Sequence, residues 1–484
     1  MDNKRTKIVA TISDQRCDTE FLKRLFDAGV NVVRLNSAHI DKEGFDRIID
    51  NVRSVDPQVP IMIDTKGAEV RTTKFEHQAN LVAGNKITIA ADPEGTSTEA
   101  CIYVNYKNFV HDVPVGARIL IDDGEVGLKV LDKDAEKLYC VIENDGVLGS
   151  RKSVNVPDVH INLPAVSDRD HQFILYAIER GLAFIAHSFV RSHKDVDEVR
   201  RILDENGGKA IKIISKIENQ EGVDNIDEII DASYGILIAR GDLGIEIDFE
   251  KIPAIQNDIV HRCILKKKPV IIATQMLHSM IHNPRPTRAE VSDVSSAILM
   301  NTDAVMLSGE TTNGKYPVDA VKTMKRIIVE AEKHLSYRGG IKLRKGENDI
   351  LGVTSYLAKY TVKSTLRLGV KAIITDVASG RCARNLSAYR GEAPIYAICK
   401  DQYITRQLNL SFGVYPIYLS HEGYNRRQYY VKAVKTLLER GLLKTDDLIA
   451  YIGGTLSNEV GTTSLEFNRV SDLLDFYSEE EQKK

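Results

Sequence analysis

Eight short apolar runs recur along the chain, and each is followed by a stretch whose apolar positions have helical spacing. Nearly continuous apolar runs are typical of parallel strands covered on both faces. Eight such strand–helix units predict an α/β fold, a closed (β/α)8 TIM barrel. The runs are Lys7–Thr11, Asn31–Leu35, Pro60–Ile63, Leu182–Ala186, Ile211–Ser215, Gly235–Ala239, Pro269–Ala273 and Asp303–Leu307.

The gap between the third and fourth runs is far longer than the others. Its pattern changes to short alternating strands separated by Gly, Asn and Asp turns, as in residues 117–124. This pattern predicts a small β-barrel or sandwich domain over residues 73–164, inserted at the rim of the TIM barrel. A domain at that rim can act as a lid. The TIM barrel is then expected to comprise residues 1–72 and 165–337.

Beyond a Gly- and Lys-rich linker, strands and helices alternate again. This alternation predicts a C-terminal domain with an open α/β sheet over residues 346–484. Its predicted strands are residues 372–375, 395–399, 414–418 and 448–452.

Composition narrows the possible functions. The 484 residues allow two or three domains, and the 65 basic and 68 acidic residues leave a net charge of −3. This balance predicts no general attraction to nucleic acid or membranes. No apolar run approaches the roughly 20 residues that span a bilayer. The first residues lead straight into a predicted strand, which indicates that there is no signal peptide. The six cysteines are scattered along the chain, which indicates reduced thiols rather than disulfides. We therefore expect a cytoplasmic protein.

Charged residues directly follow the fifth and sixth predicted strands. Lys216 and Glu218 end one strand, and Arg240, Gly241 and Asp242 end the next. The carboxyl ends of parallel strands meet at one rim, where α/β enzymes carry their chemistry. Carboxylate ligands without His or Cys favour Mg²⁺ or Mn²⁺. The spacing fits equally well a pair of carboxylates neutralised by the neighbouring Lys and Arg.

Other strand ends add candidates for binding phosphate. Arg34, Arg71 and Arg240 can hold phosphate oxygens in bidentate fashion if they converge. A lysine at the rim, Lys216, can neutralise charge on a transferring phosphoryl group. Thr274 is a candidate proton relay, although a threonine there taken alone is better explained as a strand-end or capping residue.

Several motifs together resemble those of the pyruvate kinase family. They stand in the family's order, with the inserted domain in the family's place, and the resemblance covers nearly the whole chain. Among them are Ile214-Ser-Lys-Ile-Glu-Asn219 and Ala239-Arg-Gly-Asp-Leu-Gly244, which are highly specific together. The resemblance implies transfer of a phosphoryl group from phosphoenolpyruvate to ADP, giving pyruvate and ATP, the final step of glycolysis.

The resemblance also implies roles for individual residues. Glu218 and Asp242 hold Mg²⁺ or Mn²⁺, and Lys216 stabilises the transferring phosphoryl group. Thr274 belongs to the relay that protonates the enolate carbon. The phosphate-contacting catalytic arginines are Arg34 and Arg71. The substrate-binding positions are Lys216, Ala239, Arg240, Gly241, Asp242, Thr274 and Ser308. Ser188, Arg191 and Glu310 match supporting positions near the site.

The same resemblance implies a nucleotide site and a monovalent-cation site. Arg34, Asn36 and His39 match nucleotide-binding positions, and Asn36, Asp64 and the Thr65 carbonyl match potassium ligands. The family usually reads Arg-Leu-Asn-Phe-Ser-His, whereas Ala38 stands here in place of the potassium-binding Ser. Potassium is therefore expected to bind with one ligand fewer. The family is usually a homotetramer, which we expect here.

Two other classes stay open from the residues alone. A metal-dependent carbon–carbon lyase or aldolase acting on pyruvate enolate would share the rim of Glu, Asp and Arg, but it would not need the lid or Lys216. A catalytically silent metabolite-binding regulator would be expected to lack Lys216, Glu218, Asp242 or Thr274. All four are present.

Overall fold

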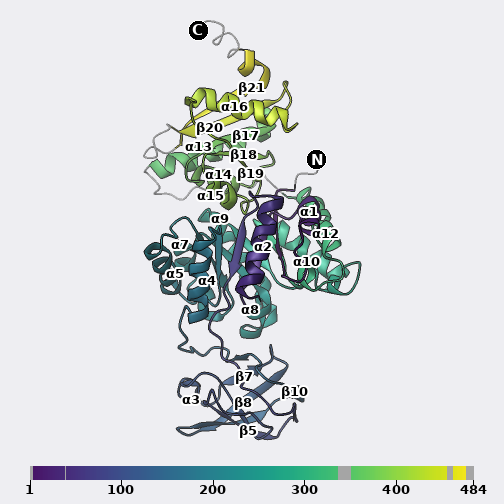
Figure 1. Cartoon of the computed structure of the whole chain (residues 1–484), viewed down its shortest axis with the longest axis vertical. Helices are drawn as coiled ribbons and strands as arrows, with labels where there is room; N and C mark the ends of the chain where they lie inside the picture. The colour runs from purple at the N-terminus through teal and green to yellow at the C-terminus, as the bar shows by residue number, and fades with distance from the viewer. Residues whose placement is uncertain (1–3, 39, 336–349, 455–461, 476–484) are drawn as a thin grey trace.

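Eight parallel strands close a barrel in the centre of the molecule (Figure 1). The computed structural model describes residues 4–38, 40–335, 350–454 and 462–475. All eight predicted strands are confirmed, and their ends differ from the prediction by at most two residues. Around the barrel they are β1 (Lys7–Thr11), β16 (Ala304–Leu307), β15 (Val270–Ala273), β14 (Gly235–Ala239), β13 (Lys212–Ile217), β12 (Phe184–His187), β3 (Ile61–Asp64) and β2 (Val32–Asn36).

Amphipathic helices surround the barrel because the strands' outer apolar side chains need cover. Several begin at side-chain caps, and Thr287 and Glu290 form a complete capping box. The longer helices are α1 (Thr19–Ala28), α2 (Lys42–Val55), α4 (Asp168–Glu179), α5 (His193–Glu205), α7 (Ile226–Ala232), α9 (Ile252–Leu265), α10 (Arg288–Leu299) and α12 (Pro317–Glu332). The short ones are α6 (Gln220–Asp224), α8 (Arg240–Glu246), α11 (Gly309–Thr312), η1 (Phe249–Lys251) and η2 (His278–Ile281).

The segment inserted after β3 is rich in strands, as predicted. It holds a six-stranded sheet in the order β11-β7-β8-β9-β5-β6 and a two-stranded sheet, β10-β4. Isolated bridges join Arg71 to Ser153, beside β11, and Thr72 to Val104, beside β6, so the segment that precedes β4 lies between the two outer strands of the larger sheet, as in a small barrel. The elements are β4 (Ala79–Leu81), β5 (Lys86–Ala90), β6 (Cys101–Tyr103), α3 (Phe109–Asp112), β7 (Arg118–Ile121), β8 (Val126–Lys133), β9 (Lys137–Ile142), β10 (Gly146–Leu148) and β11 (Val154–Asn155).

The C-terminal segment forms the predicted open α/β sheet, with strand order β19-β18-β17-β20-β21. The last strand, β21, was not predicted and runs antiparallel to β20. The elements are α13 (Ile350–Leu368), β17 (Ala372–Val377), α14 (Arg381–Ala388), β18 (Ile395–Cys399), α15 (Gln402–Leu408), β19 (Val414–Tyr418), α16 (Arg426–Glu439), β20 (Leu448–Gly454) and β21 (Thr462–Arg469).

A buried contact fixes the C-terminal sheet to the amino end of the barrel. Leu410 belongs to the same apolar cluster as barrel-interior residues such as Phe184. Arg390 donates two hydrogen bonds to Asp303, at 2.7 and 3.2 Å, and both side chains are buried. The C-terminal part therefore closes the end of the barrel opposite the predicted site.

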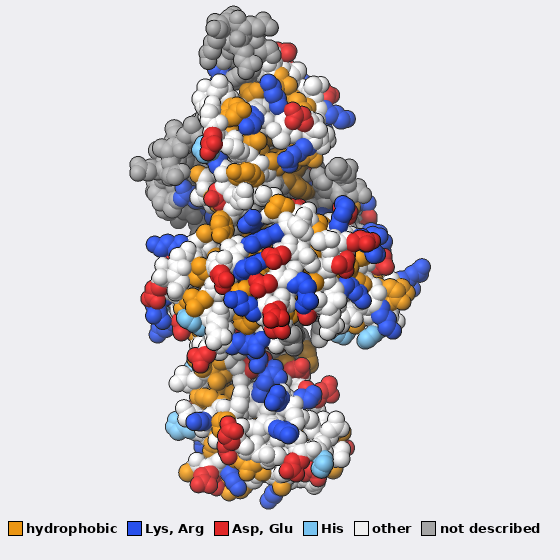
Figure 2. Space-filling view, in the orientation of Figure 1, with side chains coloured by type: hydrophobic (Ala, Val, Ile, Leu, Met, Phe, Trp, Pro, Cys, Tyr) orange, Lys and Arg blue, Asp and Glu red, His pale blue; other side chains and the backbone are white. Residues whose placement is uncertain are grey.

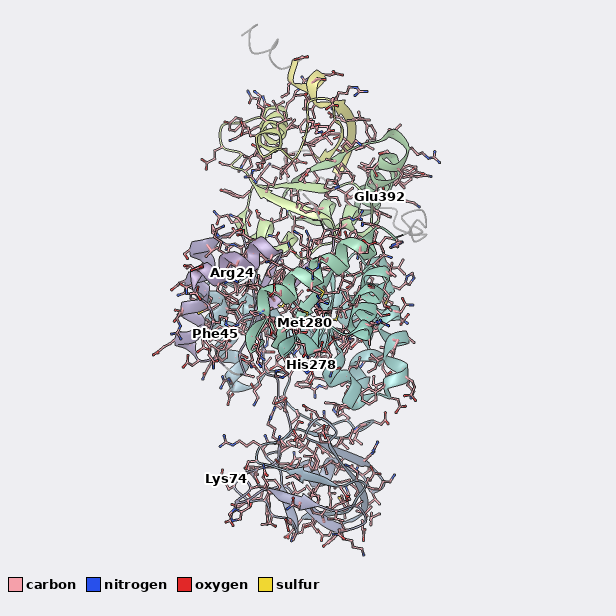
Figure 3. The ribbon with its side chains drawn as sticks, turned by 90° about the vertical axis from the view of Figure 1, so that its right-hand side faces the viewer. Arg24, Phe45, Lys74, His278, Met280 and Glu392 are labelled. Carbon is pink, nitrogen blue, oxygen red and sulfur yellow. The ribbon has the colours of Figure 1, made fainter. Side chains whose placement is uncertain are left out.

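The three parts lie one after another along the long axis of the molecule (Figure 1). In the side view, Lys74 lies in the inserted part, Phe45 in the barrel and Glu392 in the C-terminal part (Figure 3). On the face shown in Figure 2, Lys and Arg side chains are interleaved with Asp and Glu over the barrel. None of the helices among the described residues is long and apolar enough to cross a bilayer.

Candidate active site

Lys216 is the centre of a buried polar cluster at the carboxyl rim of the barrel. Its ammonium nitrogen lies 2.9 Å from Glu218 Oε1 and 3.1 Å from Asp64 Oδ1. It also donates a hydrogen bond of 2.7 Å to Ser188 Oγ. Burial alone lowers the pKa of Lys216, but the two carboxylates outweigh burial and hold this pKa above its ordinary value. The lysine therefore presents a fixed positive charge.

Asp64 connects this lysine to Arg34. Arg34 Nε lies 2.6 Å from Asp64 Oδ2, and its Nη1 donates to Thr11 Oγ1 at 3.0 Å. Burial raises the pKa of Asp64, but Arg34 and Lys216 outweigh burial and lower it overall. The carboxylate therefore stays ionised and holds two cations at fixed positions.

Glu218 and Asp242 form a pair of carboxyl groups beside Lys216. Glu218 Oε2 accepts a hydrogen bond of 2.7 Å from the Phe189 backbone N–H, and its carboxyl group is hydrogen-bonded to that of Asp242. Burial raises the pKa of Glu218 to about 7, with Lys216 opposing and the Asp242 charge adding to the shift. Burial likewise raises the pKa of Asp242. A buried carboxylate and a partly buried one this close are stable together only with a proton or a cation between them.

Thr274 follows β15 and contacts the first turn of α8. Its hydroxyl donates to the Ala273 carbonyl at 2.7 Å and accepts from the Gly241 backbone N–H at 2.8 Å. Thr274 and Gln275 both have positive φ angles, 68° and 53°, which cost strain in residues other than glycine. Strain of this kind is common where a side chain is held in one orientation for function.

The Arg240 side chain points away from the carboxyl pair. It pairs with Asp293 of α10 at 2.7 Å and donates to the backbone carbonyls of Ala273 and Thr274 at 3.3 and 2.8 Å. The alternative in which Arg240 neutralises one of the two carboxylates is therefore not supported, because the partners of Arg240 lie elsewhere. Arg240 instead ties the ends of β14 and β15 together.

The remaining predicted residues lie around the rim. Arg71 pairs with Glu69 at 2.8 Å and donates to the Arg151 carbonyl at 2.8 Å, while about a third of its side chain is exposed. The Ser308 backbone N–H donates to buried Glu310 at 2.8 Å.

Asp170, which sequence reasoning missed, accepts hydrogen bonds from the Lys66 and Gly67 backbones at 2.9 and 3.1 Å. Gly67 has a φ of +75°, and a Cβ there would lie 2.5 Å from the Phe189 ring. This turn after β3 therefore requires glycine.

The predicted potassium ligands lie beside the Arg34–Asp64 pair. Thr65 is buried, and its carbonyl accepts from Ser188 Oγ at 2.6 Å. Asn36 Oδ1 accepts from the Ala38 backbone N–H at 3.0 Å. The Ser37 hydroxyl is buried and has no hydrogen-bond partner among the described residues. His39 lies outside the described residues.

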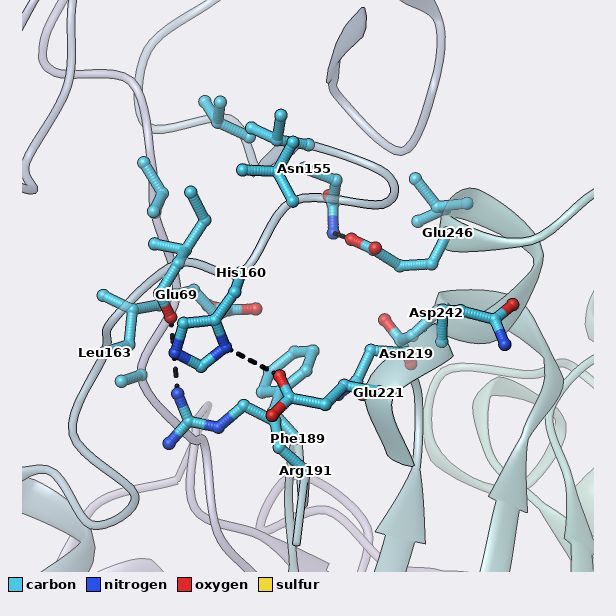
Figure 4. Close-up of a pocket in the computed structure, with 18 of the residues that line it drawn as sticks. Glu69, Asn155, His160, Leu163, Phe189, Arg191, Asn219, Glu221, Asp242 and Glu246 are labelled. Atoms are coloured by element: carbon cyan, nitrogen blue, oxygen red, sulfur yellow. Dashed lines mark hydrogen bonds and ion pairs between the residues drawn. The ribbon is translucent and has the colours of Figure 1, made fainter. Parts of the chain in front are cut away.

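A cavity of about 670 Å³ separates the barrel rim from the inserted segment (Figure 4). Its walls include Asp242, Ser188 and Arg71, so it opens directly onto the predicted site. Asn155 and Glu246 also line it, and sequence reasoning missed both. No signal in the sequence pairs these two residues, because they lie on separate parts of the chain and in ordinary polar surroundings.

Fold and site together define the class of protein. The carboxyl rim of the TIM barrel joins a charged lysine, a close pair of carboxyl groups and arginines beside a cavity. This combination is typical of an enzyme for anionic substrates. Models of two family regions match the chain: pyruvate kinase, barrel domain, over residues 3–321 and pyruvate kinase, alpha/beta domain, over residues 356–466.

Whole-chain relatives agree with these matches. The pyruvate kinase of Borreliella burgdorferi is 45% identical, over 98% of this chain and 99% of its own. That of Geobacillus stearothermophilus is 43% identical, over 97% of this chain and 81% of its own. The crystal structure of a Cryptosporidium parvum pyruvate kinase superposes with a TM-score of 0.89 at 34% identity, covering 96% of each chain.

The chain belongs to the pyruvate kinase family. Its function is that of a glycolytic phosphotransferase, which converts phosphoenolpyruvate and ADP to pyruvate and ATP. The lyase and the silent regulator left open by the residues alone are not supported by these relatives.

Proposed function

We propose that phosphoryl transfer takes place at the cluster around Lys216, where the cavity meets the barrel rim. The observation that carries this proposal is the single ammonium group within 3.1 Å of both Asp64 and Glu218. A fixed positive charge in a partly desolvated site stabilises negative charge that develops on a transferring phosphoryl group and on an enolate oxygen. Lys216 is therefore proposed as the catalytic cation.

Glu218 and Asp242 are proposed to hold the divalent metal ion that pyruvate kinases need. Burial is the main cause that raises the pKa of each carboxyl group, so their ionised forms are costly here unless a cation compensates them. Among the described residues, no cluster of three His, Cys, Asp or Glu side chains suits a metal. Two carboxylates fit Mg²⁺ or Mn²⁺, because these ions keep open positions for water and substrate oxygens. When bound, the metal would supply positive charge to those oxygens.

The substrate carboxylate is proposed to bind at the backbone from Ala239 to Asp242, at the start of α8, where the Gly241 N–H would have to exchange its bond to Thr274 for the substrate. Thr274 holds this turn through its bond to Gly241, and its hydroxyl is proposed to take part in delivering a proton to the enolate carbon. Arg240 contributes through its backbone, since its guanidinium is bonded to Asp293 and two carbonyls. Ser308 completes the proposed substrate contacts.

Arg34 and Arg71 are proposed to contact the phosphates, with Arg34, Asn36 and His39 on the nucleotide side. Arg34 is held in place by Asp64, which supports a preorganised role. Arg71 is only partly buried and is bonded to Glu69, so it would have to exchange that partner for phosphate.

Potassium is proposed to bind Asn36, Asp64 and the Thr65 carbonyl. Asp64 and the Thr65 carbonyl belong to the same hydrogen-bonded cluster as Lys216, so a cation there would stabilise the arrangement of Asp64. Ala38 removes the side-chain oxygen that the family's serine provides.

The oligomeric state, the location in the cell and the domain limits are proposed from the resemblance to the family and from the sequence. We propose a homotetramer, cytoplasmic location, and domain limits of 1–72 with 165–337, 73–164 and 346–484. The six cysteines are free, which agrees with a reducing compartment.

The experiment that tests the proposed site is a coupled assay of ATP formation from phosphoenolpyruvate and ADP. Wild-type turnover that requires Mg²⁺ or Mn²⁺, and that falls sharply in Lys216→Met, supports the assignment. A Lys216→Met enzyme that keeps wild-type turnover would move the chemistry elsewhere.

A further inference from the structure

Among the described residues, one side-chain hydrogen bond joins the inserted segment to the helix that carries Asp242. Asn155, on β11, donates from Nδ2 to Glu246 Oε1 at 3.0 Å, across the cavity (Figure 4). Glu246 ends α8, one helical turn after Asp242, and side chains four residues apart lie on the same helix face. The inserted segment therefore contacts the same short helix that holds a proposed metal ligand.

The environment of Glu246 makes this contact stronger than an ordinary surface hydrogen bond. Its carboxyl group lines the cavity and is partly buried, and burial raises its pKa. The bond from Asn155 opposes that shift, so it stabilises the ionised form. A hydrogen bond to a desolvated charged group contributes more than one between neutral groups.

Two other contacts span the same cavity, and both are weaker than the bond from Asn155. His160 and Glu221 are 2.8 Å apart, but 59% and 39% of their side chains are exposed, so water competes with the pair. Arg191 donates to the Ile161 carbonyl at 3.3 Å, but it is held mainly by Asp195, four residues further along the chain.

We propose that Asn155 and Glu246 are positioning residues which hold the inserted segment closed over the cavity and thereby set the affinity for phosphoenolpyruvate. This proposal for Asn155 and Glu246 rests on the active site proposed around Lys216 and Asp242. If the contact is lost, the open arrangement gains population in the free enzyme. Apparent affinity then falls in proportion to the closed fraction, whereas a saturating substrate still closes the enzyme. The expected signature is a higher KM with little change in kcat.

The test uses substitutions that change the charge of a side chain but hardly its shape. Asn155→Asp places two carboxylates opposite each other and abolishes the contact. Adding Glu246→Gln restores the contact with the roles exchanged, because the new amide on α8 then donates to the new carboxylate on β11. We expect Asn155→Asp to raise KM for phosphoenolpyruvate about ten-fold, as for a lost hydrogen bond to a charged group, with kcat nearly kept. The double variant should return KM to within about two-fold of wild type.

His160→Gln is the matched control, since it alters the exposed contact across the same cavity, and its KM should stay within about two-fold. Thermal unfolding of each variant checks that the fold is kept. An unchanged KM in Asn155→Asp, a double variant as weak as the single, or a fall in kcat at constant KM would overturn the proposal. A different result would show that the site proposed around Lys216 is wrong: Lys216→Met would then keep wild-type turnover, whatever the KM values of the Asn155 and Glu246 variants.

Discussion

Lys216 lies 3.1 Å from Asp64, although their strands, β13 and β3, are separated in the barrel by β12. Asp64 in turn holds Arg34 from β2 at 2.6 Å. One carboxylate thus fixes two cations from two different strands at one rim. The proposed phosphoryl-binding charges are therefore in place before substrate arrives, and the reaction need not spend binding energy on arranging them.

Removing either proposed metal ligand should weaken metal binding. We expect Glu218→Gln and Asp242→Asn each to raise the midpoint of the Mg²⁺ or Mn²⁺ activation curve by at least about ten-fold, because a hard cation loses one of two anionic oxygens. Glu221→Gln, which changes another carboxylate of the cavity wall, is the control. Midpoints that stay at the wild-type value in both variants would mean that the metal binds elsewhere.

Potassium should activate this enzyme, but more weakly than it activates relatives with serine at the position of Ala38. Ala38→Ser adds an oxygen next to Asn36 and should lower the half-activating potassium concentration several-fold, the effect of about one further polar contact. Activity is measured across a potassium series in buffer free of sodium. Full wild-type activity without any monovalent cation would be incompatible with this site.

Fructose 1,6-bisphosphate should not activate the chain. The family's activator loop reads Thr-x-Ser-Gly-Arg-Ser/Thr-Ala, and Val377 and Cys382 replace two of its hydroxyls. Val377 is buried at the end of β17, while Arg381 begins α14 and is exposed. A doubly phosphorylated sugar needs several cations or amides at each end.

Residues 453–461 include no Lys or Arg and one Glu in the sequence, and residues 455–461 lie outside the described part of the chain. Any effector is expected to carry a single phosphate, which Ser379, Gly380 and Arg381 can still bind. Phosphoenolpyruvate saturation with and without millimolar sugar bisphosphate is the measurement. A several-fold drop in half-saturation that Arg381→Ala abolishes would show this prediction to be wrong.

Asp303 should be essential for stability rather than catalysis. Its carboxylate accepts hydrogen bonds from Arg390 and from the backbones of Phe412 and Val270. Asp303→Ala would leave a buried guanidinium without this carboxylate, at a cost of about 3–5 kcal/mol. Urea unfolding of Asp303→Ala should show a lower midpoint than that of the wild type. The control is Asp27→Ala, which removes the exposed ion pair Lys23–Asp27 and should change the midpoint little. A cost below about 1 kcal/mol would contradict this account.

The barrel was predictable because its strands are buried on both faces and therefore form nearly continuous apolar runs. The rim residues were predictable for a related reason, since Lys216 and Asp242 directly follow such runs. Side-chain direction was not predictable. Arg240 follows a strand in the same way, yet its partner is Asp293 of α10. These two residues are 53 positions apart, and the local sequence of neither predicts the contact.

Contacts between residues far apart in the chain could not be predicted from the sequence, for the same physical reason. Asn155 and Glu246 lie 91 residues apart, and each is an ordinary polar residue in its own segment. The antiparallel strand β21 was missed as well, because its burial pattern is irregular rather than strictly alternating. Periodicity reports which face of an element is buried, but not which distant group it contacts.

The most direct test of the account is the turnover of Lys216→Met in the coupled assay, compared with Lys212→Met on the same strand. We expect the Lys216 change to lower kcat by about 10²–10³, the usual effect of removing one preorganised electrostatic partner, while the fold and the metal titration are largely kept. Lys212→Met should keep its turnover, because Lys212 lies at the opposite end of β13. Near-normal phosphoryl transfer by Lys216→Met would contradict the account.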